Sequence, residues 1–280
     1  MKRLLALLSF ATASCGGPGG SPPLSDAGGA PSLPPTGGSP SLPSTGGSPS
    51  LSATGGTPGR GGSPTATPNP LGRYRCKAPE GSSGSPQSIQ EAVELVNALP
   101  KPTSVACFVE SLARPLTITA TNSQFSAQPA HSTASPRVFI KIGQLWLSIV
   151  IDGQASELIE FGALLPNTFR SIKAELHLPL EAPIAPSTPF ERVMLTEYGT
   201  VCRLCHADEE REETPGIANV FSSKALKPRA DSLVRLETLA LAARDCDWQS
   251  EPHRCEMLAA LFGGGPVLEG AFPDEMQTFF

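Results

Sequence analysis

The chain has 280 residues, with 21 Lys or Arg against 26 Asp or Glu, so its net charge at neutral pH is −5. This mildly acidic balance excludes the usual nucleic-acid-binding proteins, which carry a basic stripe, and we expect no nucleic-acid partner. A membrane-spanning helix is excluded as well, because it needs about twenty apolar residues and the most apolar internal run is interrupted by Lys141, Gly143 and Gln144.

The first fourteen residues predict an export signal. Lys2 and Arg3 precede an apolar stretch that ends in small residues and a cysteine, as in a cleaved signal peptide. The sequence Thr-Ala-Ser-Cys at residues 12–15 resembles the lipobox of bacterial lipoproteins, with Thr where that motif usually has Leu. The resemblance implies that Cys15 is lipidated and that the protein is an outer-membrane lipoprotein facing the periplasm or the cell surface. We therefore expect membrane attachment through this lipid anchor only.

Residues 15–73 predict a disordered linker. They consist largely of Gly, Pro, Ser and Thr, and they contain a nine-residue repeat that starts at Gly28, Gly37 and Gly46. Each repeat offers one Leu and no helical or strand periodicity, so the segment cannot bury enough apolar surface to fold. It would act as a flexible tether.

Residues 74–188 predict a β-rich domain with one N-terminal helix. The helix is indicated by Ser88 and Glu91, which form a capping-box pair before apolar residues at helical spacing, and it ends at Pro100. Short segments rich in β-branched residues then predict strands at 105–112, 116–120, 138–142, 145–151, 158–165 and 171–178. Two of them meet at Gly143-Gln144, as in a tight hairpin. The pattern predicts an antiparallel sheet or sandwich.

Residues 189–280 predict a small helical module. Helical patterns are found at 191–198, 204–213, 232–245 and 252–261. The fold class expected for the whole chain is therefore α+β, in which a tether, a sheet and a helical module follow one another.

The pentapeptide Cys202-Arg203-Leu204-Cys205-His206 lies in this last region. Cys-x-x-Cys-His is the attachment sequence of a c-type haem, and the region resembles c-type cytochromes, although Ala207 stands where many of them have Gly. The resemblance implies one covalent haem c with thioethers to Cys202 and Cys205 and with His206 as the proximal iron ligand. It also implies single-electron transfer to an unidentified redox partner protein.

The sixth iron ligand is open at this stage. Met257 is the first choice, although its apolar neighbours equally indicate core packing. Met194, Met276 and His253 are alternatives, and an open sixth position would indicate a haem enzyme such as a peroxidase. No hydrolase or nucleotide motif is found, so an electron-transfer protein is favoured over an enzyme.

Zinc and a simple disulfide are the rival interpretations of the motif. A tetrahedral zinc site would draw on Cys202, Cys205, Cys246 and Cys255, with His206 or His253 replacing one thiol. With haem at the motif and a lipid on Cys15, four cysteines are left, and in an oxidising compartment the simplest pairing is Cys76 with Cys107 and Cys246 with Cys255.

The alternative function is a non-redox cell-envelope lipoprotein. Its cysteines would be structural, in disulfides or a zinc site, and its β domain would bind a partner. The acidic run at residues 208–213 fits either a docking patch for a basic redox partner or a solvated helix face.

Overall fold

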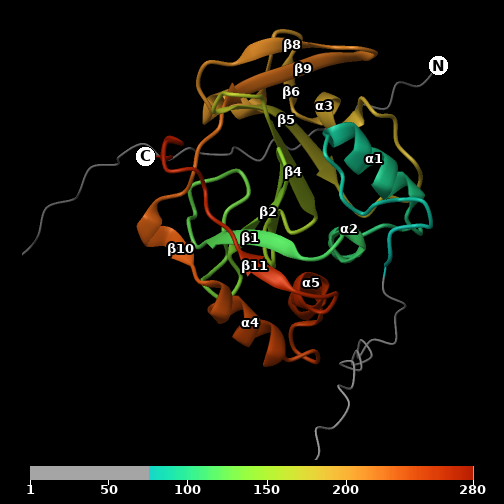
Figure 1. Cartoon of the computed structure of the whole chain (residues 1–280), viewed down its shortest axis with the longest axis vertical. Helices are drawn as coiled ribbons and strands as arrows, with labels where there is room; N and C mark the ends of the chain where they lie inside the picture. The colour runs from blue at the N-terminus through green and yellow to red at the C-terminus, as the bar shows by residue number, and fades with distance from the viewer. Residues whose placement is uncertain (1–75, 280) are drawn as a thin grey trace, which may run out of the picture. The chain divides into compact units, whose positions relative to one another are not determined.

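The computed structural model describes residues 76–279 (Figure 1). The expected signal peptide, Cys15 and the expected linker all lie outside the described residues. Within residues 76–279, no helix has the length and apolar character needed to cross a bilayer.

The described part is a mixed α+β fold built on one large sheet. Eight strands follow one another in the order β10-β1-β2-β3-β4-β5-β9-β8, all antiparallel neighbours, and β11 pairs in parallel with β1. The strands of this sheet are β1 (Leu116–Thr121), β2 (Arg137–Ile142), β3 (Leu145–Val150), β4 (Leu158–Leu164), β5 (Arg170–His177), β8 (Glu210–Thr214), β9 (Ile217–Lys224), β10 (Leu233–Val234) and β11 (Val267–Glu269). A separate two-stranded sheet consists of β6 (Met194–Thr196) and β7 (Gly199–Thr200).

The predicted hairpin is confirmed between β2 and β3. Ile142 pairs with Leu145 across the turn, and Gly143 has a positive φ of 58°, which non-glycine residues rarely adopt. A Cβ at Gly143 would lie 2.4 Å from Oε1 of Gln87. The Gln87 side chain is exposed and can move away, so the glycine is needed mainly for its backbone conformation.

Five helices and two short 3₁₀ segments complete the fold. They are α1 (Ile89–Ala98), α2 (Val105–Ser111), α3 (Thr188–Arg192), η1 (Val201–Leu204), η2 (Ala230–Ser232), α4 (Leu236–Arg244) and α5 (Pro252–Phe262). The predicted cap of α1 is confirmed, because the Ser88 hydroxyl accepts a hydrogen bond from the backbone N–H of Glu91 at 3.1 Å. Helix α2 packs on α5, and α5 packs on α4 (Figure 1).

The core lies between these helices and one face of the sheet. Alternate residues of β2, β3 and β4 are almost fully buried there, as the two-residue period of a strand requires; they include Val138, Ile140, Leu145, Leu147, Ile149, Ile159 and Phe161. On the opposite face Trp146 is covered by Phe272 of the C-terminal segment, with ring centroids 4.8 Å apart. The middle strand β3 is consequently buried on both faces.

Three predicted elements are wrong. Residues 105–112 form helix α2 and not a strand; six of its seven residues are buried, so no one-sided helical pattern shows in the sequence. Residues 204–213 contain the end of η1 and strand β8 and not a helix, because β8 pairs with β9. The predicted helix at 191–198 is mostly the end of α3 and strand β6. Charged side chains are common on edge strands such as β8, so the acidic run at residues 208–213 is compatible with an edge strand as well as with a helix.

The last ninety residues therefore combine helices with strands of the main sheet. Helices α4 and α5 lie where helical patterns were predicted, but β8, β9, β10 and β11 all join the sheet that begins with β1. The separate helical module expected for residues 189–280 is not confirmed.

Disulfides anchor α2 and α5 to segments outside the helices. Cys76 is bonded to Cys107 of α2, and Cys246 is bonded to Cys255 of α5. This is the nearest-neighbour pairing expected from the cysteine count. The first bridge closes a separation of 31 residues and the second closes one of 9.

Candidate functional site

The Cys-x-x-Cys-His motif forms one helical turn between β7 and β8. The carbonyl of Cys202 accepts hydrogen bonds from the backbone N–H of Cys205 at 3.1 Å and of His206 at 2.8 Å. The 3₁₀ segment η1 covers the first part of this turn. Cys202 and His206 are thus held one helical turn apart.

Thr200 and Glu209 fix the start of the turn. The buried Thr200 hydroxyl accepts from the N–H of Cys202 at 3.1 Å, which caps η1. The Glu209 carboxylate accepts from the N–H of Thr200 at 2.9 Å and also from its hydroxyl. The side chain of Glu209, nine residues after Thr200, therefore sets where the motif begins.

Lys224, the last residue of β9, fixes the end of the turn. Its carbonyl lies 2.8 Å from Nδ1 of His206, its N–H donates to the carbonyl of Ala207 at 3.1 Å, and its ammonium pairs with Asp208 at 2.7 Å. A carbonyl only accepts, so Nδ1 carries the proton and Nε2 keeps its lone pair. This tautomer is the one in which Nε2 can bind a metal.

Burial and nearby cations keep the His206 imidazole neutral. Burial lowers its pKa to about 3, and the positive charges of Lys173 and Arg137 act in the same direction, while the bond to Lys224 opposes them. A neutral imidazole is the form that coordinates metals.

Among charged groups, Lys173 on β5 has the largest electrostatic effect on the pKa of both Cys202 and His206. Burial lowers the pKa of Lys173 to about 8, partly offset by Cys202 and Glu160, and its ammonium donates to the Ser171 hydroxyl at 2.7 Å. Burial also raises the pKa of the Cys202 thiol to about 11, against the lowering effects of Thr200 and Lys173. Cys202 is therefore a protonated thiol at neutral pH.

A polar network continues from Lys173 across the same face of the sheet. Arg137 of β2 forms an ion pair with Glu160 of β4, and its Nε donates to the Ser148 hydroxyl at 2.6 Å. Ser148 in turn donates to the fully buried Gln128 at 2.8 Å. No sequence motif predicts this network, although alternating polar residues in β2, β4 and β5 are a signal that could have indicated it.

The motif cysteines differ in state. Cys202 is a free, half-buried thiol, whereas Cys205 is disulfide-bonded. Haem attachment needs both thiols, so Cys202 and His206 fit the cofactor as they stand and Cys205 fits it only after reduction.

The structure does not bring Met257 to the motif. Met257 is 5% exposed in the core on α5, and this helix packs on α2 and α4 rather than on the turn that holds His206. Met194 is closer, because it pairs with Thr200. Met276 lies on the C-terminal segment, which bonds to Lys227 just after β9.

The other proposed ligands are not gathered at the motif. His253 is exposed at the start of α5. Cys246 and Cys255 are bonded to each other and cannot serve as zinc thiolates. Over residues 76–279, no group of three or more His, Cys, Asp or Glu side chains is arranged to hold a metal ion.

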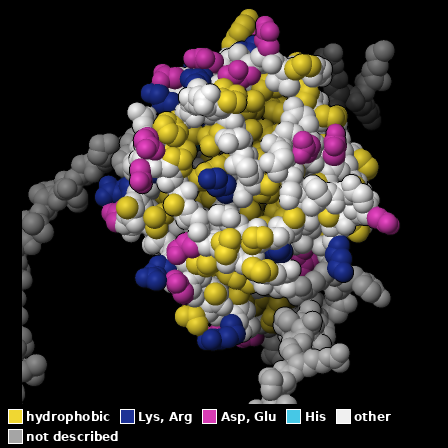
Figure 2. Space-filling view, viewed as in Figure 1, with side chains coloured by type: hydrophobic (Ala, Val, Ile, Leu, Met, Phe, Trp, Pro, Cys, Tyr) yellow, Lys and Arg dark blue, Asp and Glu magenta, His cyan; other side chains and the backbone are white. Residues whose placement is uncertain are grey.

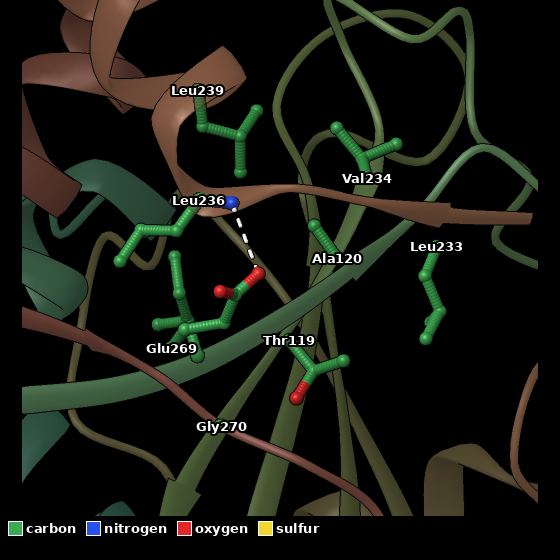
Figure 3. A pocket seen from close by; sticks show the side chains of 9 residues that line it. Thr119, Ala120, Leu233, Val234, Leu236, Leu239, Glu269 and Gly270 are labelled. Carbon is green, nitrogen blue, oxygen red and sulfur yellow. Dashed lines mark hydrogen bonds between the residues drawn. The ribbon is translucent and has the colours of Figure 1, made fainter. Parts of the chain in front are cut away.

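A hollow of about 230 Å³ lies elsewhere, between β1, β10 and α4. Its lining is mostly apolar, and the carboxylate of Glu269 accepts from the N–H of Leu236 at 3.2 Å (Figure 3). Glu269 is the one charged lining residue, and none of the motif residues lines the hollow. The hollow is thus separate from the candidate site.

Comparisons of the chain with protein-family models, with curated proteins and with solved structures found no match.

Proposed function

We propose that the protein is an exported, lipid-anchored electron-transfer protein that carries one covalent haem c at Cys202, Cys205 and His206. The observation that supports this best is the orientation of His206. Its Nδ1 is bonded to the Lys224 carbonyl, its ring is neutral, and its Nε2 is left to act as a ligand one helical turn from Cys202.

The chain's own residues would hold and orient the cofactor. Cys202 and Cys205 would supply the thioethers, and the haem would supply the one-electron chemistry. Thr200, Glu209 and Lys224 would keep the turn in place. Attachment requires Cys205 as a thiol, so its disulfide would first be reduced by an exported dithiol protein, which is itself oxidised to a disulfide.

The N-terminal residues complete this proposal. Residues 1–14 would direct export, Cys15 would carry the lipid at the outer membrane, and residues 15–73 would separate the folded part from the membrane. The redox partner would meet the protein in the cell envelope.

The test is covalent haem in the full chain. The chain is produced in an exporting host with haem-maturation machinery, and the denatured protein is analysed by its reduced pyridine-haem spectrum. We expect a covalent haem band that is lost in the Cys202→Ala, Cys205→Ala double variant and kept in the Cys246→Ala, Cys255→Ala double variant. Folded wild-type protein without this band would refute the proposal.

The sixth ligand is tested in the same preparation. Met194→Leu, Met257→Leu and Met276→Leu each remove one thioether, and the loss of the ligand is read from the visible spectrum of the folded protein. We expect Met194, which pairs with Thr200 beside the motif, to matter, and Met257 and Met276, which are 5% and 4% exposed, to leave the spectrum unchanged.

The disulfide of Cys205 favours a second candidate. In this alternative the protein is a non-redox envelope lipoprotein whose cysteines are structural and whose β domain binds a partner. Intact-mass analysis separates the two, since in this alternative the mature protein would gain no haem mass.

A further inference from the structure

Exposed apolar side chains gather around the motif turn. Leu195, Tyr198, Val201 and Leu204 are 48%, 76%, 40% and 61% exposed, and we call these four residues the motif surface. Nine large apolar side chains are exposed in the described part of the chain, and four of them fall within the ten residues 195–204. Val201 and Leu204 are three residues apart in a 3₁₀ segment, so they share one side of η1.

Acidic side chains lie next to this surface. Residues 194–216 contain six acidic and two basic side chains, a net charge of −4, whereas the rest of the chain, with 20 acidic and 19 basic residues, has a net charge of −1. Figure 2 shows acidic side chains gathered at the end of the molecule where β8 and β9 lie. Nearly all the net charge is thus placed beside the motif surface.

Some of these carboxylates are available to a partner. Glu209 is bonded to Thr200 and Asp208 is paired with Lys224, so both serve the turn itself. Glu197, Glu210 and Glu213 are exposed, and Glu210 makes only a 3.4 Å ion pair with Arg170. An exposed pair of this kind is weak in water.

We infer that the motif surface docks a protein partner that presents an apolar centre surrounded by Lys or Arg side chains. An apolar centre with a charged rim is the usual anatomy of a protein interface, and opposite charge steers the encounter. A second copy of this chain would bring like charges together, and an anionic lipid surface would be repelled. Binding of this partner does not depend on the proposed function. Electron exchange between the partner and the motif surface does depend on it.

The test uses the full-length chain and a probe peptide of alternating Lys and Leu. Binding is followed by NMR shifts of the labelled protein and by titration at low and high salt. We expect shifts confined to residues 195–213 and affinity that falls as salt rises. Glu213→Gln should weaken binding about 1.4- to 5-fold, the range of one exposed ion pair, and Leu204→Ser should weaken it about 3- to 10-fold through lost apolar contact.

Helix α4 provides matched controls, because Glu237 and Leu241 are similarly exposed there. Glu237→Gln and Leu241→Ser should leave the affinity unchanged. Equal weakening by the control variants, shifts centred on α4, or the absence of binding would overturn the inference. The titration is run with haem-free and haem-loaded protein, so binding by a chain that never takes up haem would refute the proposed function and leave the docking surface standing.

Discussion

The two ends of the sheet differ in what they bury. At the helix-covered end, α2 and α5 enclose apolar side chains such as Phe108 and Leu258, which are 1% and 0% exposed, and the disulfides of Cys107 and Cys255 lie there. At the motif end, the turn that holds Cys202 and His206 rests on polar contacts, and Lys173 is half-buried near it. Fold stability and candidate chemistry are therefore carried by different regions.

The contrast explains why the motif end can hold unusual side chains. Burying an amine such as Lys173 costs free energy, because its charged form loses water. A sheet anchored by an apolar core at the other end can tolerate that cost. Experiments at each end of the sheet test this contrast.

The largest effect is expected for Phe108→Ala in α2. The change removes a fully buried ring, and such truncations lower the free energy of unfolding by about 3–5 kcal/mol. Leu204→Ala at the motif end is the control, and it should change the free energy by less than about 0.5 kcal/mol because Leu204 is 61% exposed. Urea unfolding with disulfides intact measures both. Similar losses in the two variants would mean that the ends do not differ.

Removing the bridge between Cys76 and Cys107 should have the next largest effect. The Cys76→Ser, Cys107→Ser variant frees a loop of 31 residues, which in the chain-entropy model costs about 3–4 kcal/mol of unfolding free energy. Cys202→Ser removes a free thiol at the motif end and should cost less than about 1 kcal/mol. Thermal unfolding of the haem-free protein compares them, and a larger loss for Cys202→Ser would reverse the assignment.

Local patterns predicted the parts of the fold that local physics determines. Strands such as β2 and β3 were visible because one face alternates with the other, and the disulfide pairing followed from spacing. Helix α2 was missed because it is buried on nearly all sides, and β8 was missed because its charges suit a helix as well as an edge strand.

The candidate site was predictable only in part for a related reason. The motif itself is contiguous, so its residues could be named from the sequence. Thr200 and Glu209 support it locally, but Lys173 and Lys224 come from β5 and β9, and their approach to the turn depends on strand pairing between distant segments, such as Arg170 with Lys224. No pattern within the motif indicates that Lys173 lies near Cys202.

The smallest expected effect concerns the pH dependence that Lys173 gives to the motif end. Burial lowers its pKa from the usual 10.5 to about 8, so between pH 8 and 10.5 the folded state binds fewer protons than the unfolded state. Stability contributed by this group therefore rises with pH in that window, and below pH 8 the group is charged in both states. Allowing for its partial exposure, we expect wild type to gain about 1–2 kcal/mol relative to Lys173→Met between pH 7.5 and 10.

The measurement is urea unfolding across this pH range in a Cys202→Ser background. That background is needed because the raised pKa of the Cys202 thiol, about 11, acts in the opposite direction above pH 9. Lys141→Met, on the same face of the sheet, controls for the loss of one positive charge. If the free energies of unfolding of Cys202→Ser and of Cys202→Ser, Lys173→Met differ by a constant amount from pH 7.5 to 10, the amine is not desolvated in the folded protein. The motif end would then be an ordinary solvated surface, and the contrast between the two ends would no longer hold.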